Sequence, residues 1–263
     1  MHLPVHDPVL DPRRQREQDR RRLWRAFNAS LAFVLVLLVV FSAQQAFDWR
    51  ALAVAPQSPA GLLGLLTAPL LHGSPEHIGA NAVSLLLLGT LAGTVYPRAT
   101  LRALPLLWLG SGLGAWLLGD AGSYHLGASG LSHGLMFLVF ALGLLRRDRP
   151  AIAAAMIAFM LYGGMLLTVL PREPGVSWQA HLGGALAGLL AAWLFRRSDP
   201  LPPRKRYSWE LEEELAAQAA ATADADREQF EPASPREVPV LWQRPPRERG
   251  AVLPFPGPRR DDP

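Results

Sequence analysis

The chain has 263 residues, half of them hydrophobic, with 26 Lys and Arg against 22 Asp and Glu and no cysteine. Without cysteine there is no disulfide framework, no zinc site with cysteine ligands and no thiol catalysis. The apolar residues are gathered into runs long enough to cross a membrane, and arginine clusters lie beside those runs, which favours a membrane protein with a lipid bilayer around it and no nucleic acid as partner.

The chain begins with an arginine-rich segment, residues 1–27, which we expect to be disordered or to lie at a membrane surface. Six apolar segments follow, each of about 17 to 20 residues, which is close to the length that a helix needs to cross the hydrocarbon. They are 28–44, 77–96, 103–119, 128–145, 151–170 and 179–195. We therefore predict an all-α membrane protein in which residues 28–197 form a bundle of six transmembrane helices.

Two apolar stretches have alternative interpretations. The first span contains LAFVLVLLVVF, which resembles the hydrophobic region of a signal peptide, but its long arginine-rich leader and poor cleavage site favour a transmembrane helix. The stretch 61–71 is too short to span a membrane and contains Pro69. We expect this stretch to be an interfacial or partly inserted loop element.

Basic residues collect in alternate loops between the predicted spans. If the N-terminus is inside, the outside loops hold only Arg50 and Arg172. The inside loops hold Arg98, Arg102, Arg146, Arg147, Arg149, Arg196, Arg197, Arg204, Lys205 and Arg206. Because cytoplasmic loops carry the excess of Lys and Arg, we predict a multi-pass protein of a bacterial inner membrane with both termini cytoplasmic.

The C-terminal segment, residues 198–263, differs in composition from the rest because it is charged and rich in proline. We expect a largely disordered cytoplasmic tail in which residues 208–230 could form one solvated helix. A partner-binding role for this tail is the alternative, and we find no residues in it that indicate chemistry.

A few strongly polar residues lie inside the predicted spans, where such residues are costly and by default functional. They are His77 and Asn81 in the second span, Ser129 and His133 in the fourth, and His181 in the sixth. These three spans all run from outside to inside, and four of the five residues lie near the start of their span. We therefore predict that His77, Asn81, Ser129 and His181 share one depth just below the outer surface and form a site.

The spacing of these residues indicates what the site could do. His77 and Asn81 are four residues apart, so both project from one helix face, and both can donate hydrogen bonds to a developing oxyanion. His181 lies on one stripe with Gly184 and Gly188, and small residues at that spacing let transmembrane helices touch. Such an approach would bring His181 within the roughly 2.6–3.2 Å of Ser129 that nucleophile activation requires.

Each signal also has an ordinary structural explanation. A serine in a span often bonds to its own helix, and glycines four residues apart are common in membrane helices. A histidine at a helix start is often a cap or a packing residue. Ser129 lies between Gly127 and Gly130, but this GASGL sequence is not the G-x-S-x-G elbow, because residue 131 is leucine and no strand precedes it. The shared depth of the four residues favours catalysis.

The motifs together resemble those of rhomboid intramembrane serine proteases, over roughly residues 28–197. The motifs are HGSPEHIGAN at 72–81, GASG at 127–130 and AHLGGALAG at 180–188. The resemblance implies a six-helix bundle with a water-filled cavity open to the outside and transmembrane proteins as substrates. It implies that Ser129 is the nucleophile and His181 the general base, without an aspartate and without a cofactor or metal. The oxyanion would be held by His77, Asn81 and the backbone N–H of Ser129.

Two further histidines need an interpretation. His133 lies one turn deeper than Ser129 on the same face, where many members of the family have tyrosine, and GASGLSHG resembles the G-x-S-G-x-x-H-G pattern of the rhombosortase subset. We expect His133 to pack beneath His181 as an aromatic ring would, with a proton-handling or hydrogen-bonding role as the alternative. We expect His72 to be structural and to orient the loop or His77.

Three other classes of protein remain as alternatives. A rhomboid-like scaffold would keep the fold and bind membrane proteins without cutting them. A metal or haem site could be built from five histidines, namely His72, His77, His125, His133 and His181. A transporter is disfavoured because the sequence has no inverted repeat and no paired broken helices.

Overall fold

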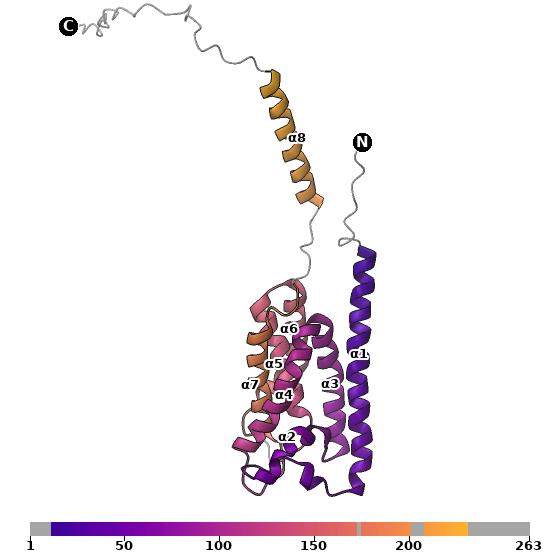
Figure 1. Ribbon diagram of the computed structural model, residues 1–263, viewed down its shortest axis with the longest axis vertical. Helices are drawn as coiled ribbons and strands as arrows, with labels where there is room; N and C mark the ends of the chain where they lie inside the picture. Colours follow the sequence, from indigo (N-terminus) through magenta and orange to yellow (C-terminus); the bar gives the residue numbers. More distant parts are fainter. Residues whose placement is uncertain (1–11, 173–174, 201–207, 231–263) are drawn as a thin grey trace, which may run out of the picture. The chain divides into compact units, whose positions relative to one another are not determined.

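The computed structural model describes residues 12–172, 175–200 and 208–230. The chain divides into two compact units, Met1–Pro203 and Arg204–Pro263. The described residues are helical apart from turns and a single antiparallel bridge between Val54 and His125. The expected all-α membrane bundle is confirmed for the first unit, which Figure 1 shows as a set of upright helices.

The first helix, α1, spans Pro12–Ala43 and is 32 residues long. From Pro12 onward the arginine-rich segment is helical and not disordered, because the helix runs without interruption from the arginine-rich part into the apolar part. Arginine, glutamine and glutamate are good helix formers, and Pro12 occupies the first helical position, where proline is tolerated. Residues 1–11 lie outside the described residues.

Short helical turns connect α1 to the bundle. They are Gln44–Ala46, Trp49–Leu52, Pro59–Leu62, α2 at Gly64–Thr67 and Ala68–Leu70. Together Pro59–Leu70 form an apolar helical segment too short to cross a membrane, as expected for residues 61–71. This segment lies at one end of the bundle, at the bottom of Figure 1.

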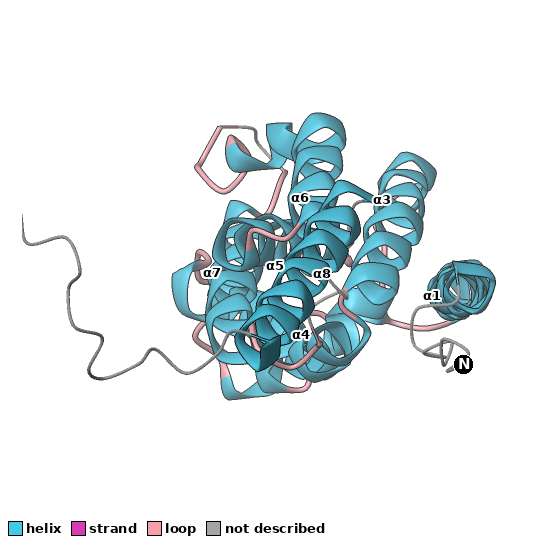
Figure 2. Cartoon of the chain, turned by 90° about the horizontal axis from the view of Figure 1, so that it is seen from above, coloured by secondary structure: helices cyan, strands magenta, loops and turns pink. Residues whose placement is uncertain are grey.

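Five helices form the body of the first unit. They are α3 at Pro75–Val95, α4 at Pro97–Leu118, α5 at Ser129–Arg146, α6 at Arg149–Tyr162 and α7 at Trp178–Phe195. Viewed from above in Figure 2, α5 lies in the middle of the bundle, and α1 stands at its edge beside α3. Accordingly, 67% of the candidate span in α5 is buried, against 17% in α1. The nucleophile candidate therefore lies on the innermost helix.

Among the described residues, five helices are long and apolar enough to cross a membrane. They are α1, α3, α4, α5 and the stretch Arg149–Leu166, which continues α6 by one turn. The sixth predicted span coincides with α7, which has 18 residues but is not among the five. Its first turn carries the polar residues Gln179 and His181, which lower its mean hydropathy. Six spans therefore remain a prediction.

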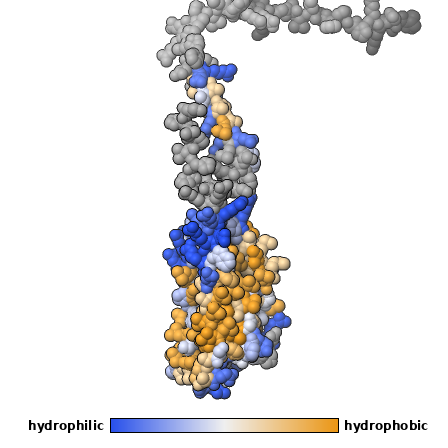
Figure 3. Space-filling view, turned by 90° about the vertical axis from the view of Figure 1, so that its right-hand side faces the viewer, coloured by the Kyte–Doolittle hydropathy of each residue, from blue (hydrophilic) through white to orange (hydrophobic). Residues whose placement is uncertain are grey.

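The outer surface of the bundle is apolar. Figure 3 shows a broad hydrophobic band between hydrophilic ends. Large apolar side chains such as Leu101 and Met160 are 71% and 79% exposed. A protein folded in water buries such residues, so this band fits a hydrocarbon environment.

The end of the bundle opposite the candidate site is held by an acidic residue that follows α7. Both carboxylate oxygens of Asp199 accept hydrogen bonds at 2.9 Å, from the backbone N–H groups of Arg98 and Ala99 at the start of α4. The guanidinium of Arg146 donates to the Asp199 carbonyl at 2.9 Å and to the Asp148 carboxylate at 3.0 Å. The end of α7 is thereby joined to α4 and to the α5–α6 turn.

The second unit contains one described helix, α8, at Ser208–Phe230. These bounds are the ones expected from the sequence. The side chains described in it are exposed, as expected for a solvated helix. The proline-rich remainder of the predicted tail, residues 201–207 and 231–263, lies outside the described residues.

Candidate active site

Helices α3, α5 and α7 all begin at the same end of the bundle, and their first residues border one cavity of about 1150 Å³. Ser129 is the first residue of α5, His77 the third of α3 and His181 the fourth of α7. Asn81 lies one turn further along α3. All four line this cavity, so the structure brings together the residues that the sequence placed at one depth.

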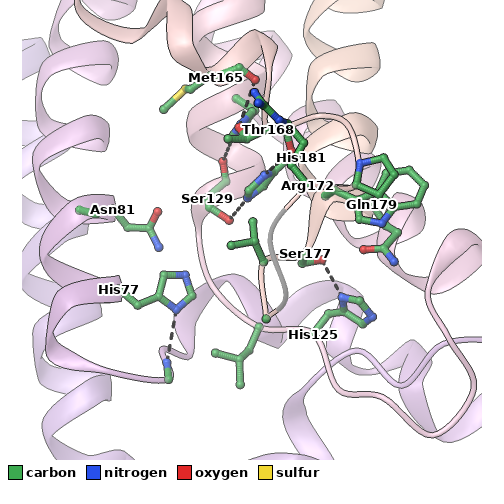
Figure 4. Close-up of a pocket in the computed structure, with 18 of the residues that line it drawn as sticks. His77, Asn81, His125, Ser129, Met165, Thr168, Arg172, Ser177, Gln179 and His181 are labelled. Carbon is green, nitrogen blue, oxygen red and sulfur yellow. Dashed lines mark hydrogen bonds between the residues drawn. The ribbon is translucent and has the colours of Figure 1, made fainter.

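The nucleophile candidate and the base candidate are in hydrogen-bond contact. The Nε2 atom of His181 lies 2.8 Å from the Oγ atom of Ser129. Figure 4 draws this contact as a dashed line. The Nδ1 atom of His181 lies 3.0 Å from the carbonyl oxygen of Thr168, which can only accept a proton. In the neutral imidazole, Nδ1 therefore carries the proton and Nε2 accepts from the Ser129 hydroxyl. A base held by a third group in this way is the arrangement that activates a serine.

This contact depends on glycines that let α5 and α7 touch. A Cβ atom added to Gly184 would lie 1.9 Å from the carbonyl oxygen of Gly130, and one on Gly188 would lie 2.4 Å from that of Gly134. The stripe predicted on α7 therefore packs directly against the backbone of α5. A second glycine contact, between Gly183 of α7 and Gly110 of α4, was missed, although Gly110 and Gly114 have the same four-residue spacing.

Gly127 in the GASG motif is required for two reasons. Its φ of +113° lies in a region that side chains other than glycine rarely adopt. A Cβ atom at this position would also lie 2.5 Å from the imidazole of His77. The Gly127 N–H donates to the Ala68 carbonyl at 2.9 Å, which anchors the loop before Ser129 to the short helices. The glycine therefore lets the imidazole and the nucleophile loop come together.

Three hydrogen-bond donors border the cavity near Ser129. The amide nitrogen of Asn81 is buried and has no hydrogen-bond partner among the described residues. The Nδ1 atom of His77 accepts from the Gly73 N–H at 3.5 Å, the upper limit for such a bond, so the neutral ring carries its proton on Nε2. The Ser129 N–H belongs to the first turn of α5, where backbone N–H groups lack an acceptor within the helix. Figure 4 places His77 and Asn81 across from the Ser129–His181 pair.

His133 makes both kinds of contact that the sequence suggested. Its ring stacks on that of His181, with the centroids 3.9 Å apart and the planes at 11°. Its Nδ1 atom lies 2.7 Å from the Ser129 carbonyl, and its Nε2 atom lies 2.8 Å from the Thr168 hydroxyl. Because the carbonyl only accepts, Nδ1 carries the proton in the neutral ring and Nε2 is the acceptor. The Thr168 hydroxyl therefore donates to Nε2, and the Met165 carbonyl at 3.2 Å is the competing acceptor for its proton. The ring is therefore fixed on both sides.

Thr168 contacts both histidines and was not singled out in the sequence. The fifth span was expected to be helical over 151–170, but α6 ends at Tyr162 and is followed by a short 3-10 helix at Gly163–Leu166. The chain then turns toward the cavity, which Thr168 lines. The Gly163–Gly164 pair is the signal that could have placed the end of the helix earlier.

His72 is completely buried and borders His77. The side-chain amide of Gln44 forms two hydrogen bonds with the backbone of His72. It donates to the His72 carbonyl at 2.8 Å and accepts from the His72 N–H at 3.0 Å. Its ring meets that of His77 edge-on, with the centroids 5.1 Å apart. Burial and the neighbouring His77 lower the pKa of His72 to about 4. These contacts fit the expected structural role beside His77.

The histidines do not form a metal site among the described residues, where no group of three His, Cys, Asp or Glu side chains could hold a metal ion. His125 in particular bonds to two serine hydroxyls. The five histidines named in the sequence are therefore not gathered into one such group among the described residues.

Comparisons with known proteins match the part of the chain that carries this site. A family model described as the Rhomboid domain matches residues 59–198, which include all the candidate site residues and leave out α1 and α8. An uncharacterized protein of Mycobacterium tuberculosis is 37% identical over 174 residues, which cover 62% of this chain and 72% of the relative. The same values hold for an uncharacterized protein of Mycobacterium bovis. One of Mycobacterium leprae is 38% identical over 141 residues, 51% of this chain and 56% of the relative.

Proposed function

The chain belongs to the rhomboid family, and from this premise we propose that it is an intramembrane serine endopeptidase in which Ser129 and His181 form the catalytic dyad. The observation that carries the proposal is the 2.8 Å contact between His181 Nε2 and Ser129 Oγ at the wall of a cavity in an apolar helical bundle. A serine with an imidazole acceptor, whose other nitrogen is held by a carbonyl, is equipped for nucleophilic attack.

The proposed reaction has two half-reactions. Ser129 Oγ attacks the scissile carbonyl carbon while its proton moves to His181 Nε2. The tetrahedral intermediate collapses, the C–N bond breaks, and His181 returns the proton to the leaving amine. A water molecule, deprotonated by His181, then hydrolyses the ester on Ser129 and regenerates the hydroxyl. The Thr168 carbonyl keeps its hydrogen bond to Nδ1 and stabilises the imidazolium that forms in each half-reaction.

The oxyanion is assigned to three donors, namely His77 Nε2–H, Asn81 Nδ2–H and the Ser129 N–H. The unpartnered amide nitrogen of Asn81 supports this assignment, because a buried donor without an acceptor is costly unless a ligand pairs with it. Removal of one such donor typically lowers the rate by about 10²–10³-fold. The N-termini of α3, α5 and α7 all lie at the cavity, and their partial positive charge adds to the stabilisation.

The proposed substrates are transmembrane proteins. A helix in a bilayer has all its peptide groups paired, so it must unwind before a carbonyl can reach Ser129. The cavity is lined in part by polar side chains, which can pair with the exposed peptide groups and admit the water that hydrolysis needs. Cleavage therefore takes place near the end of the bundle where α3, α5 and α7 begin.

We assign that end to the outer face of a bacterial inner membrane. The opposite end carries the arginines of the α3–α4 and α5–α6 turns and of the end of α7, which the positive-inside rule places in the cytoplasm. In this topology residues 28–197 are the membrane domain, and the arginine-rich segment 1–27 and the tail 198–263 are cytoplasmic.

The proposal is tested with purified full-length protein in lipid vesicles and a panel of transmembrane reporter substrates. The panel contains ordinary type I and type III segments and glycine-rich C-terminal anchors, because His133 suggests the rhombosortase subset. We expect cleavage that falls at least about 10³-fold in Ser129→Ala and in His181→Ala. Ser42→Ala, an exposed serine of α1 that bonds only to its own helix, is the matched control. Cleavage that persists in both dyad variants contradicts the proposal, and stable binding of the panel without cleavage supports the scaffold instead.

A further inference from the structure

A second histidine–serine pair lies beside the proposed dyad and is not used by the proposed reaction. The Nδ1 atom of His125 lies 2.6 Å from the Oγ atom of Ser177. Figure 4 draws this contact as a dashed line. His125 lies in the loop between α4 and α5, and Ser177 is the residue before α7. His125 precedes Ser129 by four residues, and Ser177 precedes His181 by four residues. This contact therefore joins the two segments that lead into the dyad.

The hydrogen bonds of His125 with Ser123 and Ser177 have directions that follow from the neighbouring carbonyl oxygen, which can only accept. The Ser123 hydroxyl donates to the Asp120 carbonyl at 2.6 Å, so it must accept from His125 Nε2 at 3.0 Å. In the neutral ring Nδ1 is then an acceptor, and the Ser177 hydroxyl donates to it. Burial lowers the pKa of His125, while the nearby Asp120 opposes the shift. Ser177 also accepts from the Ala180 N–H at 3.4 Å as the cap of α7.

The His125 backbone is fixed independently of its side chain. Its N–H and carbonyl groups pair with Val54, each at 2.9 Å. A Cβ atom on Gly119 would lie 2.6 Å from His125 Nε2, so the glycine leaves room for the ring. The ring therefore extends from a loop that is held in place and reaches across to α7.

The dyad lies between two points of contact. On the inner side, Gly130 of α5 packs against the backbone of α7 at Ala180 and Gly184, where neither backbone can move closer. On the outer side, the only described hydrogen bond between a side chain of the α4–α5 loop and one of the α7 cap is that of His125 with Ser177. A tilt of α7 about the glycine contact would change the distance between His181 Nε2 and Ser129 Oγ, and the outer contact opposes it.

We propose that His125 and Ser177 are positioning residues that form a clasp holding the starts of α5 and α7 at the separation in which Ser129 and His181 react. The inference rests on the proposed function of Ser129 and His181, and it adds two residues that touch neither the reacting atoms nor the oxyanion donors. Because a misplacement of about 1 Å can lower a rate by about 10²-fold, loss of the clasp should slow the chemical step by about 10- to 100-fold.

The test measures the rate at which a serine-reactive fluorophosphonate probe labels Ser129 in the purified full-length protein, together with kcat and KM on a reporter substrate. His125→Ala and Ser177→Ala are expected to slow labelling and lower kcat by about 10- to 100-fold with KM unchanged. The double variant is expected to be no slower than Ser177→Ala alone, because both substitutions remove the same contact and only Ser177→Ala also removes the cap of α7.

Conservative variants separate positioning from general destabilisation. His125→Asn places an amide near the position of Nδ1 and Ser177→Thr keeps both hydroxyl and cap, so both should recover most of the rate. His125→Gln, whose amide mimics Nε2, should not recover it. Gln57→Asn is the matched control, because Gln57 donates to Gly119 of the same loop at 3.3 Å and, among the described residues, makes no hydrogen bond to α7. Its labelling rate should stay within about twofold of that of the unmodified protein.

The outcomes distinguish the two proposals. If the unmodified protein is labelled at Ser129 and the labelling rates of His125→Ala and Ser177→Ala are within about twofold of its rate, the positioning role of the clasp is wrong and the dyad assignment stands. If the unmodified protein is not labelled at Ser129, the dyad assignment is wrong, and the positioning role of His125 and Ser177 is wrong with it. A loss of rate that is equal in His125→Asn and His125→Gln also contradicts the clasp.

Discussion

Replacing Gly184 by alanine should separate α5 from α7 and disrupt the proposed dyad. The added Cβ would lie 1.9 Å from the Gly130 carbonyl oxygen, whereas ordinary contacts begin at 3.4 Å, so the two backbones must move apart by about 1.5 Å. Gly130 follows Ser129 directly, and Gly184 is one turn from His181. A displacement of that size at the crossing point lengthens the 2.8 Å contact between His181 Nε2 and Ser129 Oγ beyond hydrogen-bond reach.

The expected cost is a fall in kcat/KM of at least about 100-fold, or ~2.7 kcal/mol of transition-state stabilisation. The assay is reporter cleavage by protein in lipid vesicles, with the unfolding temperature measured in parallel. Gly79→Ala is the matched control, because a Cβ at Gly79 of α3 meets nothing within 4 Å. A Gly184→Ala variant that keeps more than about a third of the unmodified rate would refute the reasoning that backbone contact sets the dyad distance.

Three further predictions concern residues around the site and at the opposite end. The pKa of His72 is lowered to about 4 in the folded protein, so the unfolded chain binds more protons between about pH 4 and its usual value of 6.5. The free energy of unfolding should therefore rise with pH across that window, and this group contributes up to ~1.36 kcal/mol per pH unit. In thermal unfolding, the stability of His72→Leu should depend less steeply on pH than that of the unmodified protein. Equal pH dependences of the two proteins would contradict this. Asp199→Ala removes two backbone contacts at the start of α4 and should lower stability by about 1–2 kcal/mol. Its probe-labelling rate should stay within twofold, and a large loss of labelling would show that the far end controls the site. His133→Phe keeps an aromatic ring against His181 but loses the bonds to Ser129 and Thr168, so kcat should fall about tenfold with KM unchanged; an unaltered kcat would mean that stacking alone matters.

The parts of the structure that the sequence predicted well are those set by local signals. Ser74 and Ser177 cap α3 and α7, and each accepts a backbone N–H three residues on. Such caps, together with the apolar runs, fix where helices start, and the starts of α3, α5 and α7 determine which polar residues share a depth. The glycine stripe on α7 predicted a close helix contact, and Gly184 packs against α5 as expected.

The parts that the sequence did not predict depend on contacts between distant segments. Thr168 reaches His133 and His181 only because α6 ends at Tyr162, earlier than the apolar run suggests. His125 was noted only as a possible metal ligand, because its contact with Ser177 depends on the path of two loops that are 52 residues apart. The helical start of α1 at Pro12 was not predicted, because an arginine-rich composition is typical of disordered segments although arginine, glutamine and glutamate also favour helices.

Peptide mapping of the protein after reaction with a fluorophosphonate probe tests the central assignment most directly, since the probe forms a covalent bond only with a serine whose hydroxyl is activated. We predict a single adduct, on Ser129, that is absent from the Ser129→Ala protein and from the His181→Ala protein. An adduct on any other residue, or one on Ser129 that forms at the same rate without the His181 imidazole, would contradict the account.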